Sequence, residues 1–203
     1  MIGSRNTAGF GRRGSTGLVT TSGQSRRRTS RINGRSNVAV KSSIDLERDP
    51  RSIVGKRVLD APRALVFSLW SDPKHLGQWW GPNGFTTTTR AFDFRPGGIW
   101  RFVMHGPDGR DYQNRIIFDE IVPPERIVYR HDGGDDVEPV QFAQTVTFAD
   151  LGNGQTLLTW HGTFPSAEER TRVIREYGAD KGLVQTMARL DEYVVTMSST
   201  RNA

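Results

Sequence analysis

Residues 165–197 read PSAEERTRVIREYGADKGLVQTMARLDEYVVTM, and the rest of the chain is organised around this stretch. Ser166 and Glu169 match a capping box, in which a serine side chain and a glutamate three residues later satisfy the first amides of a helix. Apolar residues then recur at about 100° per residue. They are Val173, Tyr177, Leu183, Val184, Met187, Ala188, Leu190, Val194 and Val195. The pattern predicts one long amphipathic helix of about 45 Å.

Two features interrupt the apolar stripe of this predicted helix. Gly178 and Gly182 lie four residues apart on one face, although glycine costs about 1 kcal/mol relative to alanine in a helix. Asp180 and Asp191 project into the stripe, where a buried carboxylate has a raised pKa unless it is paired. The stretch is therefore either a kinked core helix or one wall of a cavity. The aspartates are acid–base candidates, exposed groups near a helix end, or partners of a strand arginine. The strand arginines considered are Arg101, Arg115 and Arg130.

The N-terminal part differs in composition from the rest. Residues 1–43 hold nine of the 28 Lys and Arg residues and no acid, which leaves 19 basic against 22 acidic residues in the remainder. This composition predicts a disordered tail over residues 1–48, a folded domain over 49–198 and a disordered end over 199–203. The tail is a solvated extension from a misplaced start, an organellar transit peptide, or a polyanion contact through residues 26–31.

The residue composition and the lengths of the apolar runs exclude several classes of protein. Cysteine is absent, so the chain has no disulfide framework and no cysteine-based metal site. No apolar run approaches the roughly 18 residues that would predict a membrane span, and no apolar segment typical of a secretory signal follows Met1. Because the domain without its tail is mildly acidic, nucleic-acid binding is not expected. The predicted location is cytoplasmic, or an organellar matrix if the tail is a transit peptide.

The order of predicted elements defines the fold class. A strand over residues 52–59 is followed by a helix that begins at Asp60-Ala61-Pro62 and by an irregular WWGPNGF segment at 79–85. Period-two alternation then predicts six strands, over 86–94, 99–105, 112–121, 126–131, 142–148 and 156–164. Consecutive antiparallel strands with helices at the ends make an α+β domain. A curved sheet of about seven strands wrapped around the C-terminal helix would enclose a pocket.

Four segments carry a family resemblance. They are DAPRALVF at 60–67, WWGPNGF at 79–85, RPGGIW at 95–100 and FPSAEE at 164–169. These resemble the SRPBCC (START-related, helix-grip) superfamily, in the AHSA-type branch similar to the C-terminal domain of the heat-shock-protein ATPase activator. The resemblance covers about residues 50–197. It implies the helix-grip fold, with an antiparallel sheet gripping the C-terminal helix around a hydrophobic cavity. Members include lipid carriers, polyketide cyclases, ligand-sequestering proteins and a chaperone activator, without a shared catalytic constellation.

Residues on the expected inner face are the candidate ligand contacts. They are Trp80, Phe94, Trp100, Phe102, Met104, Tyr112, Phe118, Trp160, Leu183 and Met187. Trp80, with its neighbour Trp79, offers a large rigid surface for a ligand, or else plugs one end of the core.

Polar rings and carboxylates are the candidate catalytic groups. His105, Tyr112 and Asp180 could serve as general acids or bases inside a cavity. Strand alternation, however, puts His105 on the face opposite Trp100 and Phe102, and His161 opposite Trp160. No two histidines have metal-ligand spacing, so no metal site is predicted. The turn glycines are not followed by a helix, so no nucleotide cofactor is expected.

Three functions follow from these observations. The first is binding of a hydrophobic small molecule or lipid in the cavity. The second is a stress-response co-chaperone role, in which a surface activates a heat-shock-protein ATPase. The third is a cyclase or hydrolase reaction in the same cavity. A homodimer is a further option for the assembly.

Overall fold

The computed structural model describes residues 42–134 and 136–201. The arginine-rich segment of residues 1–41, and the transit-peptide and polyanion interpretations that depend on it, lie outside the described residues. The described part forms an α+β domain with eight strands in one sheet. Its strands are β1 (Ser42–Asp45), β2 (Ser52–Leu59), β3 (Thr86–Phe92), β4 (Ile99–His105), β5 (Asp111–Val122), β6 (Arg126–His131), β7 (Phe142–Gly152) and β8 (Gln155–Thr163). Its helices are α1 (Arg63–Ser71), α2 (Pro73–Trp79), α3 (Ala167–Tyr177) and α4 (Ala179–Arg201).

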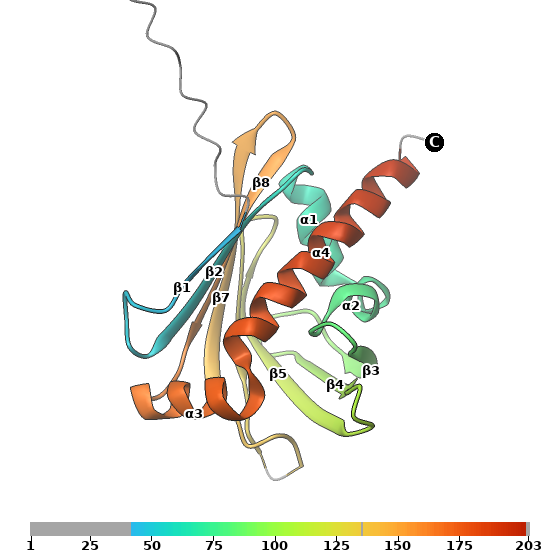
Figure 1. Cartoon of the computed structure of the whole chain (residues 1–203). Helices are drawn as coiled ribbons and strands as arrows, with labels where there is room; N and C mark the ends of the chain where they lie inside the picture. Colours follow the sequence, from blue (N-terminus) through green and yellow to red (C-terminus); the bar gives the residue numbers. More distant parts are fainter. Residues whose placement is uncertain (1–41, 135, 202–203) are drawn as a thin grey trace, which may run out of the picture. The chain divides into compact units, whose positions relative to one another are not determined.

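The sheet is antiparallel throughout and has the order β1-β2-β8-β7-β6-β5-β4-β3. In β6 and β8 buried residues alternate with less buried ones, as a sheet with one covered face requires. Figure 1 shows α4 crossing that face, with α1 and α2 beside it. The predicted α+β class and the curved sheet around a C-terminal helix are therefore confirmed.

Ordered structure extends beyond both ends of the predicted domain, residues 49–198. Residues 42–45, inside the predicted tail, pair with β2 as strand β1, from Ser42 opposite Arg57 to Asp45 opposite Val54. Ile44 packs against a small apolar cluster that includes Ile53. At the other end α4 continues to residue 201, through part of the segment predicted as disordered. A four-residue strand has too few residues for its alternation to stand out from a polar tail, which explains the first error.

The predicted single long helix is two helices, so that prediction is wrong in this respect. The serine half of the predicted capping box forms, because the Ser166 hydroxyl accepts a hydrogen bond from the Glu169 amide at 3.1 Å. The Glu169 carboxylate accepts from Arg172 instead. The first helix then ends at Gly178, which has a left-handed φ of 60° and donates its N–H to Ile174 O. Glycine adopts this conformation without a Cβ penalty and commonly ends helices in this way.

α4 lies close to the sheet at Gly55 on β2. A Cβ atom there would lie 2.7 Å from Met187 Sδ and 3.0 Å from Leu183 Cδ2. Real Cβ atoms do not tolerate such contacts unless the neighbours move, so the missing side chain lets the helix lie directly on the strand.

An ion pair lies one turn further along the same contact. Arg57 Nη2 donates to Asp191 Oδ2 at 2.7 Å, and the two side chains are only 15% and 9% exposed. The strand arginines considered from the sequence make other pairs: Arg101 and Arg115 bind Asp136, and Arg130 binds Asp119. Asp191 is therefore a paired structural group at the helix–sheet contact.

We expect Gly55→Val to lower the free energy of unfolding by about 1–3 kcal/mol, because the added methyl groups would overpack the contact with α4. Urea denaturation followed by circular dichroism measures this change. The control is Gly77→Ala in α2, whose Cβ would have only an ordinary contact, 3.6 Å from Thr87 O. The control should be neutral or gain up to about 1 kcal/mol through helix propensity. Equal stability of Gly55→Val and wild type would contradict the close approach.

Candidate functional site: a two-chamber cavity

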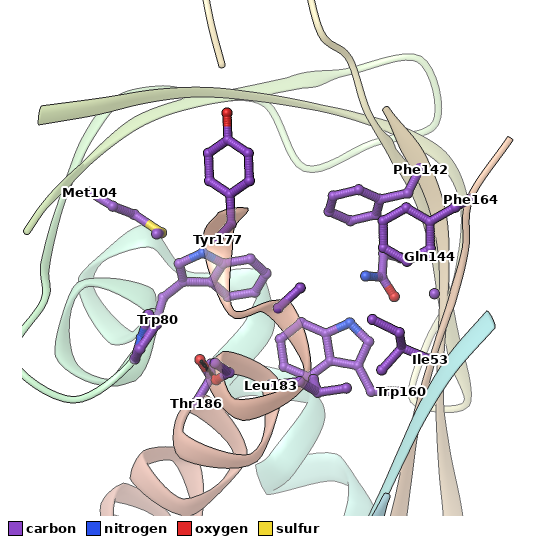
Figure 2. A pocket seen from close by; sticks show the side chains of 15 residues that line it. Ile53, Trp80, Met104, Phe142, Gln144, Trp160, Phe164, Tyr177, Leu183 and Thr186 are labelled. Carbon is purple, nitrogen blue, oxygen red and sulfur yellow. Dashed lines mark hydrogen bonds between the residues drawn. The ribbon is translucent and has the colours of Figure 1, made fainter. Parts of the chain in front are cut away.

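The domain contains two adjoining chambers, which share the lining residues Trp80, Met104, Phe142, Tyr177 and Ala179. We name the first the α4 chamber. Its volume is about 210 Å³. It is also lined by Ile53, Gly81, Pro82, Gln144, Trp160, Gly162, Phe164, Gly182, Leu183 and Thr186. Figure 2 shows these side chains arranged around a common space, with Leu183 and Thr186 contributed by α4.

We name the second the His131 chamber, and its volume is about 200 Å³. It is completed by Phe102, Tyr112, Asn114, His131, Glu138, Val140 and Val173. A further hollow adjoins both chambers at Met104 and Tyr177. Tyr177 is the last residue of α3, so the helix break at Gly178 places its ring where the three spaces meet.

The structure places part of the predicted ligand set around this cavity and part away from it. The residues that line a chamber are Trp80, Phe102, Met104, Tyr112, Trp160 and Leu183. The residues that line neither chamber, and pack in or against the main core cluster, are Phe94, Trp100, Phe118 and Met187. Strand alternation identifies the inner face correctly, but the inner face is longer than the cavity. Phe67 of α1 fills the other end, in edge contact with Phe94 and Phe148.

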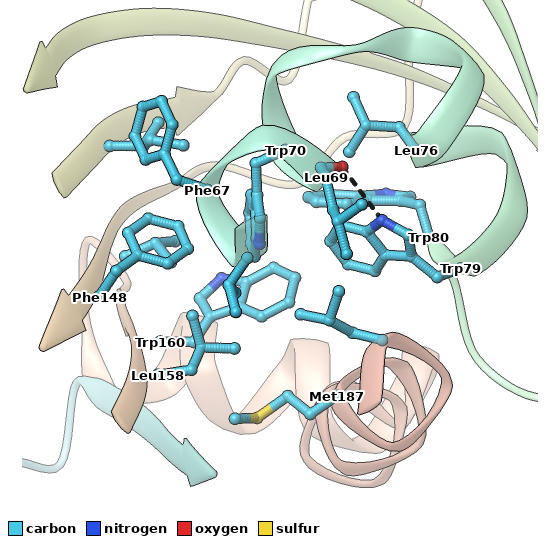
Figure 3. Close-up of a cluster of buried hydrophobic side chains, with 14 of the residues drawn as sticks. Phe67, Leu69, Trp70, Leu76, Trp79, Trp80, Phe148, Leu158, Trp160 and Met187 are labelled. Atoms are coloured by element: carbon cyan, nitrogen blue, oxygen red, sulfur yellow. Dashed lines mark hydrogen bonds between the residues drawn. The ribbon is translucent and has the colours of Figure 1, made fainter. Parts of the chain in front are cut away.

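Trp80 combines the two roles that the sequence left as alternatives. Its side chain is in the core cluster, and its ring contacts Trp100 at 4.8 Å and Trp160 at 5.3 Å between centroids. Figure 3 shows Trp70, Trp79, Trp80 and Trp160 gathered in this cluster. Trp80 also lines both chambers. One end of the cavity is therefore a packed aromatic wall, which is expected to be rigid.

Two side chains of α4 hold the loop that carries Trp80. Gln185 Oε1 accepts from the Asn83 amide at 3.1 Å. Arg189 Nη1 donates to Gly81 O, Pro82 O and Phe85 O at 2.9–3.0 Å. Burial lowers the pKa of Arg189, although an arginine stays protonated in proteins. This clamp fixes the WWGPNGF segment as part of the cavity wall.

The catalytic candidates are dispersed rather than gathered. His105 lines neither chamber, and its Nδ1 and Nε2 lie 2.6 Å from Asp111 Oδ1 and 2.9 Å from Thr88 Oγ1. Asp180 lies half-buried in the first turn of α4 and also lines neither chamber. Tyr112 does line the His131 chamber, with Arg110 stacked 4.3 Å from its ring centroid. His161 likewise is not a lining residue, and its Nε2 lies 3.0 Å from Ser52 Oγ. No acid–base pair therefore faces the cavity from this set.

His131 also lines the second chamber, although it was not among the catalytic or ligand-binding candidates chosen from the sequence. Its Nδ1 lies 3.0 Å from Val140 O and its Nε2 lies 2.8 Å from Asn114 Oδ1. The Asn114 amide in turn donates to Tyr112 O at 2.7 Å. Burial is the main cause that lowers the pKa of His131. The signal for finding it was present, because alternation puts His131 on the same face as Ile127 and Tyr129.

One carboxylate borders the His131 chamber. The Glu138 side chain is 14% exposed, and its Oε2 accepts from Arg110 Nη2 at 2.8 Å and from the Tyr177 hydroxyl at 3.4 Å. The charge of Glu138 raises the pKa of Arg110. Glu138 is thus an ion-paired group at the edge of the cavity.

Within residues 42–134 and 136–201, no three His, Asp or Glu side chains are grouped closely enough to hold a metal ion. The helices of the described part include none that combines the length and apolar character needed to cross a membrane.

Comparison with known proteins identifies the family. The sequence model for "Activator of Hsp90 ATPase homolog 1-like protein" matches residues 60–195, which is more than half of the chain. The chain therefore belongs to this family, as the resemblance of its motifs predicted. Among curated proteins, none matches the chain significantly.

Solved structures share the fold. A solution structure of a protein from Arthrobacter aurescens is 26% identical, with a TM-score of 0.69 over 76% of this chain and 91% of that one. A protein from Chromobacterium violaceum is 28% identical, with a TM-score of 0.58 over 72% and 98%. The protein named AHSA1 from Silicibacter pomeroyi, at 19% identity, has a TM-score of 0.57 over 72% and 99% and supports the fold alone.

We expect the imidazole of His131 to titrate below its ordinary pKa of about 6.5. Below pH 6.5 the unfolded chain then binds a proton that the folded chain does not. The free energy of unfolding should therefore fall as the pH decreases towards the folded pKa, by at most about 1.4 kcal/mol per pH unit. NMR titration of the ring measures the pKa, and urea denaturation at pH 7 and pH 5.5 measures the stability. His131→Gln should show a smaller pH dependence over this interval.

A His131 pKa above 6.5 would contradict this prediction. It would mean that the two oxygen acceptors on the ring nitrogens outweigh burial and hold the ring in its charged form.

Proposed function

We propose that this member of the Hsp90 ATPase activator-like family binds a small, mainly apolar molecule in the α4 and His131 chambers. The observation that carries the proposal is the cavity itself, which lies between α4 and the inner face of the sheet and is lined by aromatic and aliphatic side chains. Small-molecule sites in proteins are typically such pockets, with a few polar groups that orient the ligand.

Small residues border this space. Ala179 lines both chambers and Gly182 lines the α4 chamber, so the walls leave room there that a large side chain would occupy.

The dimensions favour a compact ligand. Each chamber is smaller than the roughly 300–1,000 Å³ of pockets that hold drug-sized molecules. A molecule of one or two rings fits one chamber, and a longer molecule would occupy both past Tyr177.

We expect Ala179→Trp to abolish binding of the uncharged fluorescent probe N-phenyl-1-naphthylamine. Ala179 lines both chambers, so an indole at this position would occupy the shared space. The measurement is the saturable rise in probe fluorescence, together with the shift in melting temperature that a bound ligand produces.

The matched control is Val184→Trp, which adds the same ring to the same helix on its exposed face, where Val184 is 40% exposed. It should bind the probe like the wild type. Equal binding by wild type and Ala179→Trp, with both folded by circular dichroism, would show that the probe does not enter the cavity.

The family match favours a second function, activation of a heat-shock-protein ATPase through the surface of the domain. The test adds the chain to an Hsp90-type ATPase and measures ATP turnover. Ala179→Trp separates the two functions, because it should block the cavity while leaving a surface-mediated stimulation intact. The absence of any stimulation by the wild-type chain would remove this second function.

A further inference from the structure

One side chain in the wall of the α4 chamber is chemically unlike its neighbours. Gln144 of β7 lies directly across from Gly162 of β8 in the sheet register. A Cβ atom on Gly162 would lie 3.0–3.2 Å from the Nε2, Oε1 and Cδ atoms of Gln144. The amide therefore lies flat over the glycine, close to the strand, in a position that a larger residue at 162 would disturb.

The amide oxygen of Gln144 is buried and has no hydrogen-bond partner among the described residues. A buried polar group left in this state costs about 1–3 kcal/mol. In Figure 2 the amide end points into the space bordered by Ile53, Phe142 and Trp160, so nearby side chains offer it an apolar surface. Its natural complement is a hydrogen-bond donor that arrives with a ligand.

The buried indole N–H of Trp160 also lacks a hydrogen-bond partner of normal geometry among the described residues, but it is a donor and not an acceptor. The two hydroxyl groups that line this chamber are engaged. The Thr186 hydroxyl donates to Gly182 O at 2.8 Å within α4. The Tyr177 hydroxyl is directed to Glu138 Oε2 at 3.4 Å. Gln144 thus has hydrogen-bonding capacity that these two groups lack, and it lies among the rings of Phe142, Trp160 and Phe164.

We propose that Gln144 selects the ligand, and that the ligand class is a one- or two-ring aromatic molecule carrying a single hydroxyl or N–H group that donates to Gln144 Oε1. This inference rests on the proposed binding function. The aromatic walls match a flat apolar body. The buried acceptor discriminates because a molecule without a donor leaves it unpaired.

The test compares 2-naphthol with 2-methylnaphthalene, which places a methyl group where 2-naphthol has its hydroxyl. Dissociation constants are measured for the wild type, Gln144→Leu and Gln144→Met. Both substitutions keep the side chain close to its original size and remove the acceptor. We expect 2-naphthol to bind each variant about 5- to 30-fold more weakly than the wild type, while 2-methylnaphthalene binds equally well or better. Both variants should be at least as stable as the wild type, because each removes an unsatisfied buried oxygen.

Gln113→Leu is the matched control, since Gln113 is an exposed glutamine on β5 that lines neither chamber. It should change neither dissociation constant. An unchanged ratio of the two constants in the Gln144 variants, or an equal loss for both compounds, would overturn the role of Gln144 and leave cavity binding intact. Failure of the wild type to bind either compound would overturn this inference together with binding of aromatic molecules in the cavity.

Discussion

The architecture depends on the contact between α4 and β2 at Gly55. An open sheet of eight strands presents one apolar face, and α4 is the long helix that crosses it. Because Gly55 has no side chain, Leu183 and Met187 lie directly on the strand, and the Arg57–Asp191 pair extends the same contact. A straight helix cannot follow a curved sheet closely along its whole width. Where α4 packs closely on β2, it cannot also pack closely on the more distant strands. Other elements fill most of the space between α4 and those strands, and the cavity is the part that stays open.

The break at Gly178 determines where that opening lies. Because α3 ends there and α4 begins one residue later, Val173 of α3 packs with Ile53, Val140 and Phe164 in a separate small cluster. The main core cluster, on the other side, is filled by the tryptophans and by α1. The chambers lie between these two packed regions. A continuous helix would carry Tyr177 along the α4 axis, whereas the glycine break places it at the junction of the chambers.

Much of the fold could be predicted from local patterns, because alternation and helical spacing report directly on which face is buried. Local patterns could not predict which residues of the inner face pack in the core and which line the cavity. Phe94 and Phe118 share the pattern of Phe102 but line neither chamber, since Phe67 from a distant helix contacts Phe94, which in turn contacts Phe118. The partner of Asp191 is likewise fixed by where α4 crosses β2. The helix break was visible as Gly178, a residue type that commonly ends helices in the left-handed conformation, but the apolar stripe that continues past it favoured a single helix.

Two inward-facing polar groups differ in their hydrogen-bond partners. The ring nitrogens of His131 lie within hydrogen-bond distance of Val140 O and Asn114 Oδ1, and the Asn114 amide donates to Tyr112 O, so both side chains are engaged inside the protein and connect β5, β6 and the segment at Val140. Gln144 has no such partners for its buried oxygen. An engaged group contributes to the structure, whereas the unpartnered acceptor in an apolar wall is the feature on which the proposed discrimination between ligands depends.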